Sequence, residues 1–167
     1  MSSIPRRGHY ILRKTSSENP VLPPGGMYAT YQAPGQVVKL EPQVPGAVER
    51  QTWEVLPLLG SNDIAIIRAV VDDNAIPTMK FMHNKSIEDN SPVISDEEKP
   101  FRLNFVCRIE GDIEIYTICA TDSGPVGVLP YVGTDRRDES ELTINCLPII
   151  PGIDRPAWAF IPVGPWD

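Results

Sequence analysis

Short runs of β-forming residues recur along the whole chain, with turn-forming residues between them. Twelve runs have this character: His9–Lys14, Met27–Tyr31, Val37–Glu41, Thr52–Leu56, Asp63–Val70, Met79–His83, Pro92–Ser95, Arg102–Ile109, Ile113–Cys119, Val126–Val132, Leu142–Pro148 and Ala157–Ile161. No window shows the 3.6-residue apolar period of an amphipathic helix. The pattern therefore predicts an all-β chain.

Two of these runs give the clearest local signal, that of a β-hairpin. Apolar and polar residues alternate in Phe105–Ile109 and in Ile113–Ile118, as they do in strands with one buried face. The segment Glu110-Gly111-Asp112 joins the two runs and supplies the glycine and aspartate that tight turns favour.

Large aromatic residues recur at the start of three predicted strands, as Trp53, Phe105 and Trp158. They are 52 and 53 residues apart, which divides the twelve strands into three pseudo-repeats of four. This period predicts a β-trefoil, a six-stranded barrel with a hairpin cap, in which each aromatic fills an equivalent core position. Chance spacing is the alternative explanation, and a two-sheet sandwich is the alternative fold.

Composition supports this picture and limits the cellular setting. We expect the 167 residues to form one domain over residues 1–167, with an ordered core from about residue 8 to residue 162. The 18 prolines and 12 glycines interrupt the chain too often for long helices. No apolar run is long enough to span a membrane, and residues 1–7 lack the apolar segment of a secretory signal. We therefore expect a soluble, cytoplasmic monomer.

Charge and cysteine content narrow the choice of partner. A net charge of −7 and an isoelectric point near 4.8 argue against nucleic-acid binding, which needs clustered positive charge. The acidic residues gather in segments 88–98 and 135–141, which we interpret as solvated loops. Cys107, Cys119 and Cys146 are an odd number in apolar runs, which indicates buried free thiols in a reducing compartment.

Residues that could carry catalysis or hold a metal are sparse. His9 and His83 have no Cys, Asp or Glu at metal-ligand spacing. The sequence contains no GxSxG, Walker, GxGxxG or HExxH motif. Cys119 is more simply a core thiol than a nucleophile. We therefore expect a protein that is not an enzyme, uses no metal or cofactor, and acts by binding.

One loop has a composition suited to binding. Pro23 and Pro24 favour an extended backbone, and Gly25 and Gly26 let another backbone approach closely because they have no Cβ. A tight turn is the simpler alternative. Two further loops, residues 42–51 and 71–77, also carry proline, glycine or asparagine. In a trefoil such loops are the usual place for function.

Four segments resemble the mycocypins, the clitocypin and macrocypin protease inhibitors of mushrooms. These segments are Gly25–Ala29, Lys39–Pro42 ahead of Trp53-Glu54-Val55, Asp73–Pro77 and Asp154–Trp158. They occur in order and at matching intervals from about Gly8 to Phe160, whereas the acidic segment Ser86–Lys99 matches less well. The resemblance implies a β-trefoil that reversibly inhibits papain-like cysteine proteases, in keeping with a defensive role.

In that family two loops act together as a wedge across the active-site cleft of the protease. The resemblance assigns this role to Pro23, Pro24, Gly25, Gly26 and Met27, and to Pro42, Gln43, Val44, Pro45 and Gly46. A glycine pair can pass close to a catalytic cysteine without a side chain to clash. The prolines hold the loops extended before binding, which lowers the entropy lost on association.

The resemblance also implies a second inhibitory loop, directed at the asparaginyl endopeptidase legumain. It assigns this loop to Asp73, Asn74 and Ala75, with Asn74 entering an asparagine-selective pocket. The alternative is that Asn74 only supplies a left-handed turn. Because this residue is not Lys or Arg, we do not expect the loop to inhibit trypsin.

The same fold is also compatible with carbohydrate binding. Gln51-Thr52-Trp53 fits the Gln-x-Trp motif of ricin-type trefoil lectins, in which an aromatic ring stacks on a sugar. The corresponding segments of the other repeats, Leu103-Asn104-Phe105 and Pro156-Ala157-Trp158, lack the glutamine. A lectin is therefore the alternative function.

Overall fold

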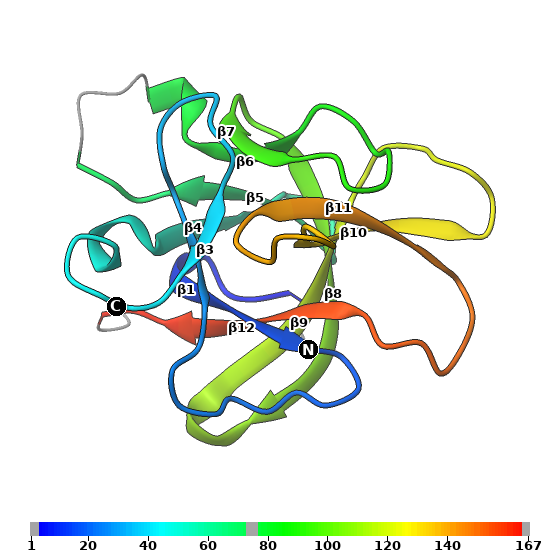
Figure 1. Ribbon diagram of the computed structural model, residues 1–167, viewed down its shortest axis with the longest axis horizontal. Helices are drawn as coiled ribbons and strands as arrows, with labels where there is room; N and C mark the ends of the chain where they lie inside the picture. The colour runs from blue at the N-terminus through cyan, green and yellow to red at the C-terminus, as the bar shows by residue number, and fades with distance from the viewer. Residues whose placement is uncertain (1–3, 73–76, 165–167) are drawn as a thin grey trace.

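The computed structural model describes residues 4–72 and 77–164, and its centre is a closed ring of six antiparallel strands (Figure 1). In ring order these strands are β1 (Gly8–Ser16), β4 (Thr52–Pro57), β5 (Ile64–Ala69), β8 (Pro100–Ile109), β9 (Ile113–Ala120) and β12 (Pro156–Pro162). The last strand, β12, pairs with β1 over seven residue pairs and closes the ring. A closed ring leaves none of these six strands with an unpaired edge.

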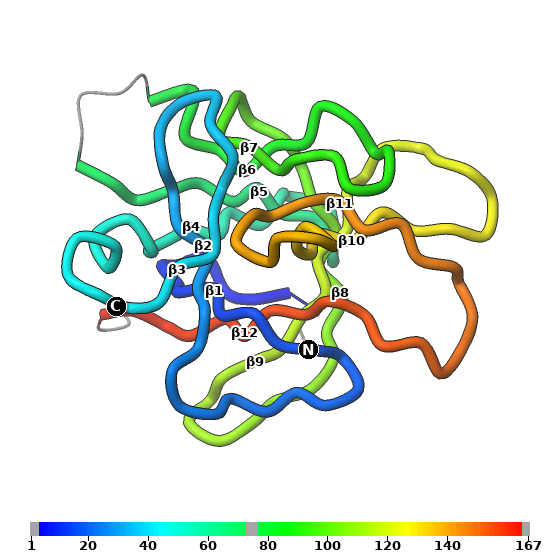
Figure 2. The backbone as a smooth tube through the Cα atoms, in the orientation of Figure 1, coloured from blue at the N-terminus to red at the C-terminus, as the bar shows by residue number. Residues whose placement is uncertain are grey.

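Three hairpins form the cap of this barrel. They are β2 (Tyr28–Thr30) with β3 (Lys39–Glu41), β6 (Phe81–Asn84) with β7 (Val93–Asp96), and β10 (Val128–Thr134) with β11 (Leu142–Pro148). The hairpins meet through backbone hydrogen bonds of 2.9 Å from Val38 N to Val93 O and from Leu142 N to Val38 O. The twelve strands thus form three lobes, namely lobe 1 (β1–β4), lobe 2 (β5–β8) and lobe 3 (β9–β12), and the tube in Figure 2 shows this arrangement. The predicted β-trefoil is confirmed, and each of the twelve predicted runs overlaps a strand.

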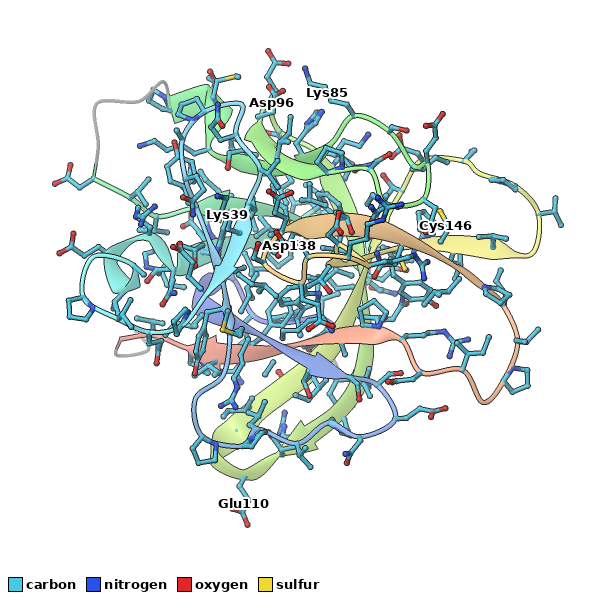
Figure 3. The ribbon with its side chains drawn as sticks, in the orientation of Figure 1. Lys39, Lys85, Asp96, Glu110, Asp138 and Cys146 are labelled. Atoms are coloured by element: carbon cyan, nitrogen blue, oxygen red, sulfur yellow. The ribbon has the colours of Figure 1, made fainter. Side chains whose placement is uncertain are left out.

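Short 3₁₀ turns provide the only helical structure in the described part of the chain. They are η1 (Val48–Arg50), η2 (Pro77–Met79) and η3 (Glu110–Asp112). In residues 4–72 and 77–164, no helix has the length and apolar character needed to cross a membrane. The turn η3 joins β8 to β9 as predicted, with Gly111 at φ 77° and Asp112 at φ 59°. Figure 3 places Glu110 at the outer tip of this hairpin.

The aromatic residue that fills the core of lobe 2 is Phe101 and not Phe105. Trp53 in β4 pairs with Ala69, Trp158 in β12 pairs with Lys14, and Phe101 holds the same register position in β8. All three are almost completely buried, whereas Phe105 is 49% exposed. The prediction of an even period was therefore wrong at its middle member. The lobes differ in length, so the equivalent residues are 48 and 57 residues apart.

The two acidic segments are only partly solvated loops. Asp96 belongs to β7 and is 8% exposed, and its Oδ2 forms an ion pair with Lys85 Nζ at 3.2 Å (Figure 3). The two segments also meet, because Arg136 Nη2 lies 2.9 Å from Asp89 Oδ1. Carboxylates that the sequence suggested were merely solvated therefore hold two loops together.

The three cysteines are free thiols, but they differ in burial. Cys119 is buried on β9, whereas Cys107 and Cys146 are half-buried. Burial raises the pKa of the Cys119 thiol to about 12. A thiol with so high a pKa is protonated at neutral pH and is a poor nucleophile, which agrees with its interpretation as a core residue.

Candidate functional site

Two of the loops singled out in the sequence meet the same end of one strand pair, β2 and β3. The β1–β2 loop (residues 17–27) leads into β2, and the β3–β4 loop (residues 42–51) leaves β3. Tyr28 of β2 pairs with Glu41 of β3, so Met27 and Pro42 are the next residues outward on the two strands. In Figure 2 the β1–β2 loop runs below this pair and the β3–β4 loop lies to its left. The fold therefore places the bases of the two predicted loops side by side.

The tips of both loops are open to solvent and carry no charge. In the β1–β2 loop, Gly26 is half-buried and its neighbours are exposed: Pro23, Pro24, Gly25 and Met27. In the β3–β4 loop all five predicted residues are exposed: Pro42, Gln43, Val44, Pro45 and Gly46. The apolar side chains of Met27 and Val44 are 37% and 46% exposed. Both tips are thus accessible to a partner protein.

Gly25 and Gly46 adopt backbone conformations that strongly favour glycine. Their φ angles are +80° and +89°, in the left-handed region where a Cβ meets its own backbone. A Cβ at either position would otherwise meet nothing within 4 Å. Glycine at these two tips is therefore explained by backbone geometry and not by crowding.

Gly26 has a different role, because it makes room for Arg13. Arg13 is a buried residue of β1, and its Nη2 donates a hydrogen bond to the Pro23 carbonyl. A Cβ on Gly26 would overlap the Arg13 side chain, lying 2.8 Å from its Cδ. The guanidinium also lies 5.9 Å from the ring centre of Tyr28, within cation–π range. Arg13 therefore supports the tip from beneath.

An apolar cluster lies under the middle of the β1–β2 loop. Leu22 packs against a buried cluster of Ile115 in β9 with Ala157 and Ala159 in β12. Other partly buried apolar residues of the β8–β9 hairpin and of β12 pack against the same cluster, namely Val106, Cys107, Ile109, Ile113 and Ile161. Figure 1 shows the loop passing across this hairpin at the bottom of the view. The hairpin extends beyond the barrel and so provides a surface on which the loop rests.

Polar contacts fasten the start of the same loop to the segment before β12. Ser17 N donates to Arg155 O at 2.9 Å, and Arg155 N donates to Ser17 Oγ at 2.9 Å. Glu18 N donates to Asp154 Oδ1 at 3.1 Å. The loop is therefore held at its start, its middle and its tip, which reduces the conformational entropy that binding would remove.

Gln51 holds the base of the β3–β4 loop from inside the protein. Its side chain is fully buried, and Nε2 lies 3.1 Å from each of Thr30 Oγ1, Glu41 O and Pro42 O. Trp53, two residues on, is also fully buried and donates its indole N–H to Ala29 O at 3.0 Å. Neither side chain is available to a sugar. The Gln-x-Trp motif is therefore structural here, and it does not support the alternative of a lectin.

Arg50 closes the same loop from its other end. Its Nε donates to Gly46 O at 3.2 Å, and its Nη1 donates to Tyr31 O at 3.2 Å. The guanidinium therefore joins the loop tip to the chain just after β2. Arg13 and Arg50 did not stand out in the sequence, because an arginine usually faces solvent. Gln51 stood out only as part of the Gln-x-Trp motif, and its role in holding the loop was not predicted.

The third predicted loop, with Asp73, Asn74 and Ala75, lies outside the described residues. Its flanks are β5, which ends at Ala69, and η2, which begins at Pro77. A groove of about 790 Å³ lies between the residues that follow β5 and the β3–β4 loop, and Val71 and Arg50 help to line it. In the described residues, no group of three or more His, Cys, Asp or Glu side chains is placed to hold a metal ion.

Comparison with known proteins gives one consistent family. The family model for the peptidase inhibitor clitocypin matches residues 8–160, which include parts of all three lobes. Clitocypin-5 and Clitocypin-4/-3 of Clitocybe nebularis are each 32% identical over 154 residues, covering 92% of this chain and 94% of theirs. Clitocypin of the same fungus is 29% identical over 157 residues, covering 92% and 95%.

Proposed function

The chain belongs to the clitocypin family of peptidase inhibitors, and we propose that it inhibits papain-like cysteine proteases with the β1–β2 and β3–β4 loops as a joint wedge. One observation carries this proposal. Two loops with exposed, uncharged tips that contain glycine flank the same end of the β2–β3 pair, and buried side chains fasten each of them. An inhibitor needs such rigid, accessible loops, whereas a purely structural connection does not.

The backbone at the tips also explains how the loop resists cleavage in this proposal. Proteases bind substrates in an extended conformation, which requires negative φ angles. Gly25 at φ +80° departs from this extended path. The loop fills the cleft, and the catalytic thiolate has no correctly placed bond to attack.

Preorganisation supplies much of the affinity in this proposal. Each flexible side chain that becomes immobile on binding costs about 0.5–1.5 kcal/mol. Prolines and glycines make up most of the two tips and have almost no side-chain entropy to lose. A wedge of two loops can reach the roughly 800 Å² per partner of a standard interface. Because the tips carry no charge, we expect the affinity to depend little on salt.

The test is a titration of papain with the wild type, with Gly25→Trp and with Gly60→Trp as a matched control. Gly60 has φ +83° and open space around it, like Gly25, but it lies at the far end of β4. The two substitutions therefore impose the same backbone strain. We expect Gly25→Trp to lose inhibition and Gly60→Trp to retain it. Equal loss in both variants, or in neither, would contradict the wedge.

We also propose that Asn74 directs a second inhibitory activity at legumain. The support is the family resemblance together with the residue itself, an asparagine next to the small Ala75. Asn74→Ala is expected to abolish inhibition of legumain and to leave inhibition of papain unchanged. If the variant still inhibits legumain as the wild type does, this part of the proposal is wrong.

A further inference from the structure

Lobe 3 repeats the sequence device that holds the β3–β4 loop of lobe 1. An arginine precedes the buried tryptophan by three positions in both lobes, as Arg50 and Trp53 and as Arg155 and Trp158. The Trp158 indole donates to Val132 O at 2.9 Å, as the Trp53 indole donates to the equivalent carbonyl in β2. The two lobes therefore share both residues and the hydrogen bond that the tryptophan makes.

Arg155 closes the β11–β12 loop (residues 149–155) as Arg50 closes the β3–β4 loop. Its Nη2 donates to Ile150 O at 2.9 Å, and its Nη1 donates to Ile153 O at 3.1 Å. Lobe 2 lacks this device, because Glu98 precedes Phe101 there and only residues 97–99 connect β7 to β8. Two of the three lobes thus keep an arginine-fastened loop at this place.

The β9–β10 loop (residues 121–127) lies beside the β11–β12 loop. Ile149 N donates to Gly127 O at 2.8 Å, which joins the two loops where they leave the β10–β11 hairpin. The base of the β9–β10 loop is fixed by an ion pair of 2.9 Å between Asp122 and Lys99. These two loops therefore correspond to the pair of loops at the end of β2 and β3 in lobe 1.

The tips of the lobe 3 loops have the same chemistry as those of lobe 1. No charged residue occurs in segments 123–127 and 147–153. Val126 is fully exposed, and Ile149 and Ile150 are 56% and 52% exposed. Gly127 and Gly152 have φ angles of +82° and +80°. Exposed aliphatic side chains beside left-handed glycines thus recur on a second pair of loops.

The lobe 3 loops also project further from the barrel. The paired residues Tyr131 and Asn145 in lobe 3 are equivalent to Tyr28 and Glu41 in lobe 1. Tyr131 pairs with the first strand of its lobe, β9, as Tyr28 pairs with β1. The β10–β11 hairpin continues for three more residue pairs, to Val128 and Pro148. Three pairs add about 10 Å of strand. The apolar tips therefore form a convex projection.

We propose that the β9–β10 and β11–β12 loops are a second docking wedge, which binds a second papain-like protease molecule. This inference rests on the proposed function of the lobe 1 loops. A convex, uncharged, aliphatic tip fits the concave, largely apolar subsites of a protease cleft. A second copy of this chain is a poorer fit, because two convex tips bury little area against each other.

The surface of the molecule has room for two enzymes. Two interfaces of roughly 800 Å² would together cover less than a fifth of its 8959 Å² of exposed surface. In Figure 1 the β9–β10 and β11–β12 loops lie at the right of the view, whereas the β3–β4 loop lies at the left. The β1–β2 loop lies at the bottom, so the two wedges occupy different sides of the molecule in this view.

The test is the mass of the complex with excess papain, measured by size-exclusion chromatography with light scattering. We expect the wild-type inhibitor to bind two papain molecules. The double variant Val126→Asp/Ile150→Asp should bind one papain molecule, and so should Gly25→Trp. The variant that combines these three changes should bind none. Leu59→Asp is the matched control, because Leu59 is as exposed as Val126 but lies on the β4–β5 turn. It should still bind two. Unchanged thermal unfolding of each variant shows that it is folded.

Other outcomes separate this inference from the proposed function. One papain per wild-type inhibitor, lost in Gly25→Trp and kept in the double variant, would overturn the second wedge alone. Two papain molecules that both persist in the double variant would overturn it as well. If the wild-type inhibitor is a dimer in the absence of papain and the double variant is a monomer, the β9–β10 and β11–β12 loops bind a second copy of this chain instead. Wild type that binds no papain would overturn both proposals.

Discussion

Replacing Arg13 by alanine should loosen the proposed inhibitory tip without unfolding the protein. The side chain is 9% exposed, donates to Pro23 O and lies over the Tyr28 ring. A hydrogen bond from a charged donor contributes about 1.5–3 kcal/mol, and a partly buried cation–π contact contributes about 1–2 kcal/mol. Water can replace the guanidinium at the exposed Pro23 carbonyl. We therefore expect a net loss of about 2–3 kcal/mol.

The loss should appear in both unfolding and inhibition. In a domain of this size about 2–3 kcal/mol lowers Tm by about 5–10 °C. The prolines of the tip stay fixed, so the released residues are Gly25 and Gly26. Ordering each backbone again on binding costs about 1–2 kcal/mol. A total of at least about 2 kcal/mol corresponds to a rise of about thirtyfold in the inhibition constant for papain.

The assay is a steady-state titration of papain together with differential scanning calorimetry. Arg102→Ala is the control, because Arg102 forms an exposed ion pair with Asp63 at 3.0 Å, and such pairs contribute about 0–1 kcal/mol. Neither its Tm nor its inhibition constant should change appreciably. An Arg13→Ala variant that matches the control in both measurements would refute the support that we assign to Arg13.

Three further predictions follow from the contacts described above. Gly26→Ala should weaken inhibition of papain in the wild-type background and much less in the Arg13→Ala background, because the added Cβ clashes with the Arg13 side chain. A double-mutant cycle measures this coupling. Phe101→Ala should lower the free energy of unfolding by about 3–5 kcal/mol and Phe105→Ala by about 1 kcal/mol, which urea denaturation can compare. The hydrogen bond from Arg136 holds the pKa of Asp89 below its usual value, so its small stabilisation should be present above about pH 4 and vanish as the pH falls further. The free energies of unfolding of Arg136→Ala and wild type should therefore differ by less than about 1 kcal/mol at pH 7 and converge as the pH falls through the lowered pKa of Asp89.

The strands could be predicted from the sequence because the alternation of side chains and the turn residues are local signals. The equivalence of the core aromatics could not, because it depends on register. Phe101 follows Trp53 by 48 residues and precedes Trp158 by 57, so an even spacing pointed to Phe105 instead. Loop length can differ between lobes at little energetic cost. Equivalent residues are therefore unevenly spaced along the chain, and a search for an even period selects the wrong residue.

The position of the candidate loops was also predictable, but the reasons for their residues were only partly so. In the sequence Gly25 and Gly26 look like one pair with one role. In the structure Gly25 supplies a positive φ, and Gly26 leaves space for a side chain from β1. That side chain is Arg13, whose partner Pro23 is ten residues away on another element. No local pattern reports such a contact.

The supports of the β1–β2 loop have a consequence for the newly synthesised chain. The loop belongs to lobe 1, yet it rests on the β8–β9 hairpin and is tied to Arg155, which is 138 residues after Ser17. At about 5–20 residues per second, a ribosome needs roughly 7–28 s to extend the chain over that distance. During this time the loop is present without the contacts that Arg155 makes with its start. The rigid loop forms only when the last lobe folds, so an unfinished chain carries the inhibitory sequence without the inhibitory shape.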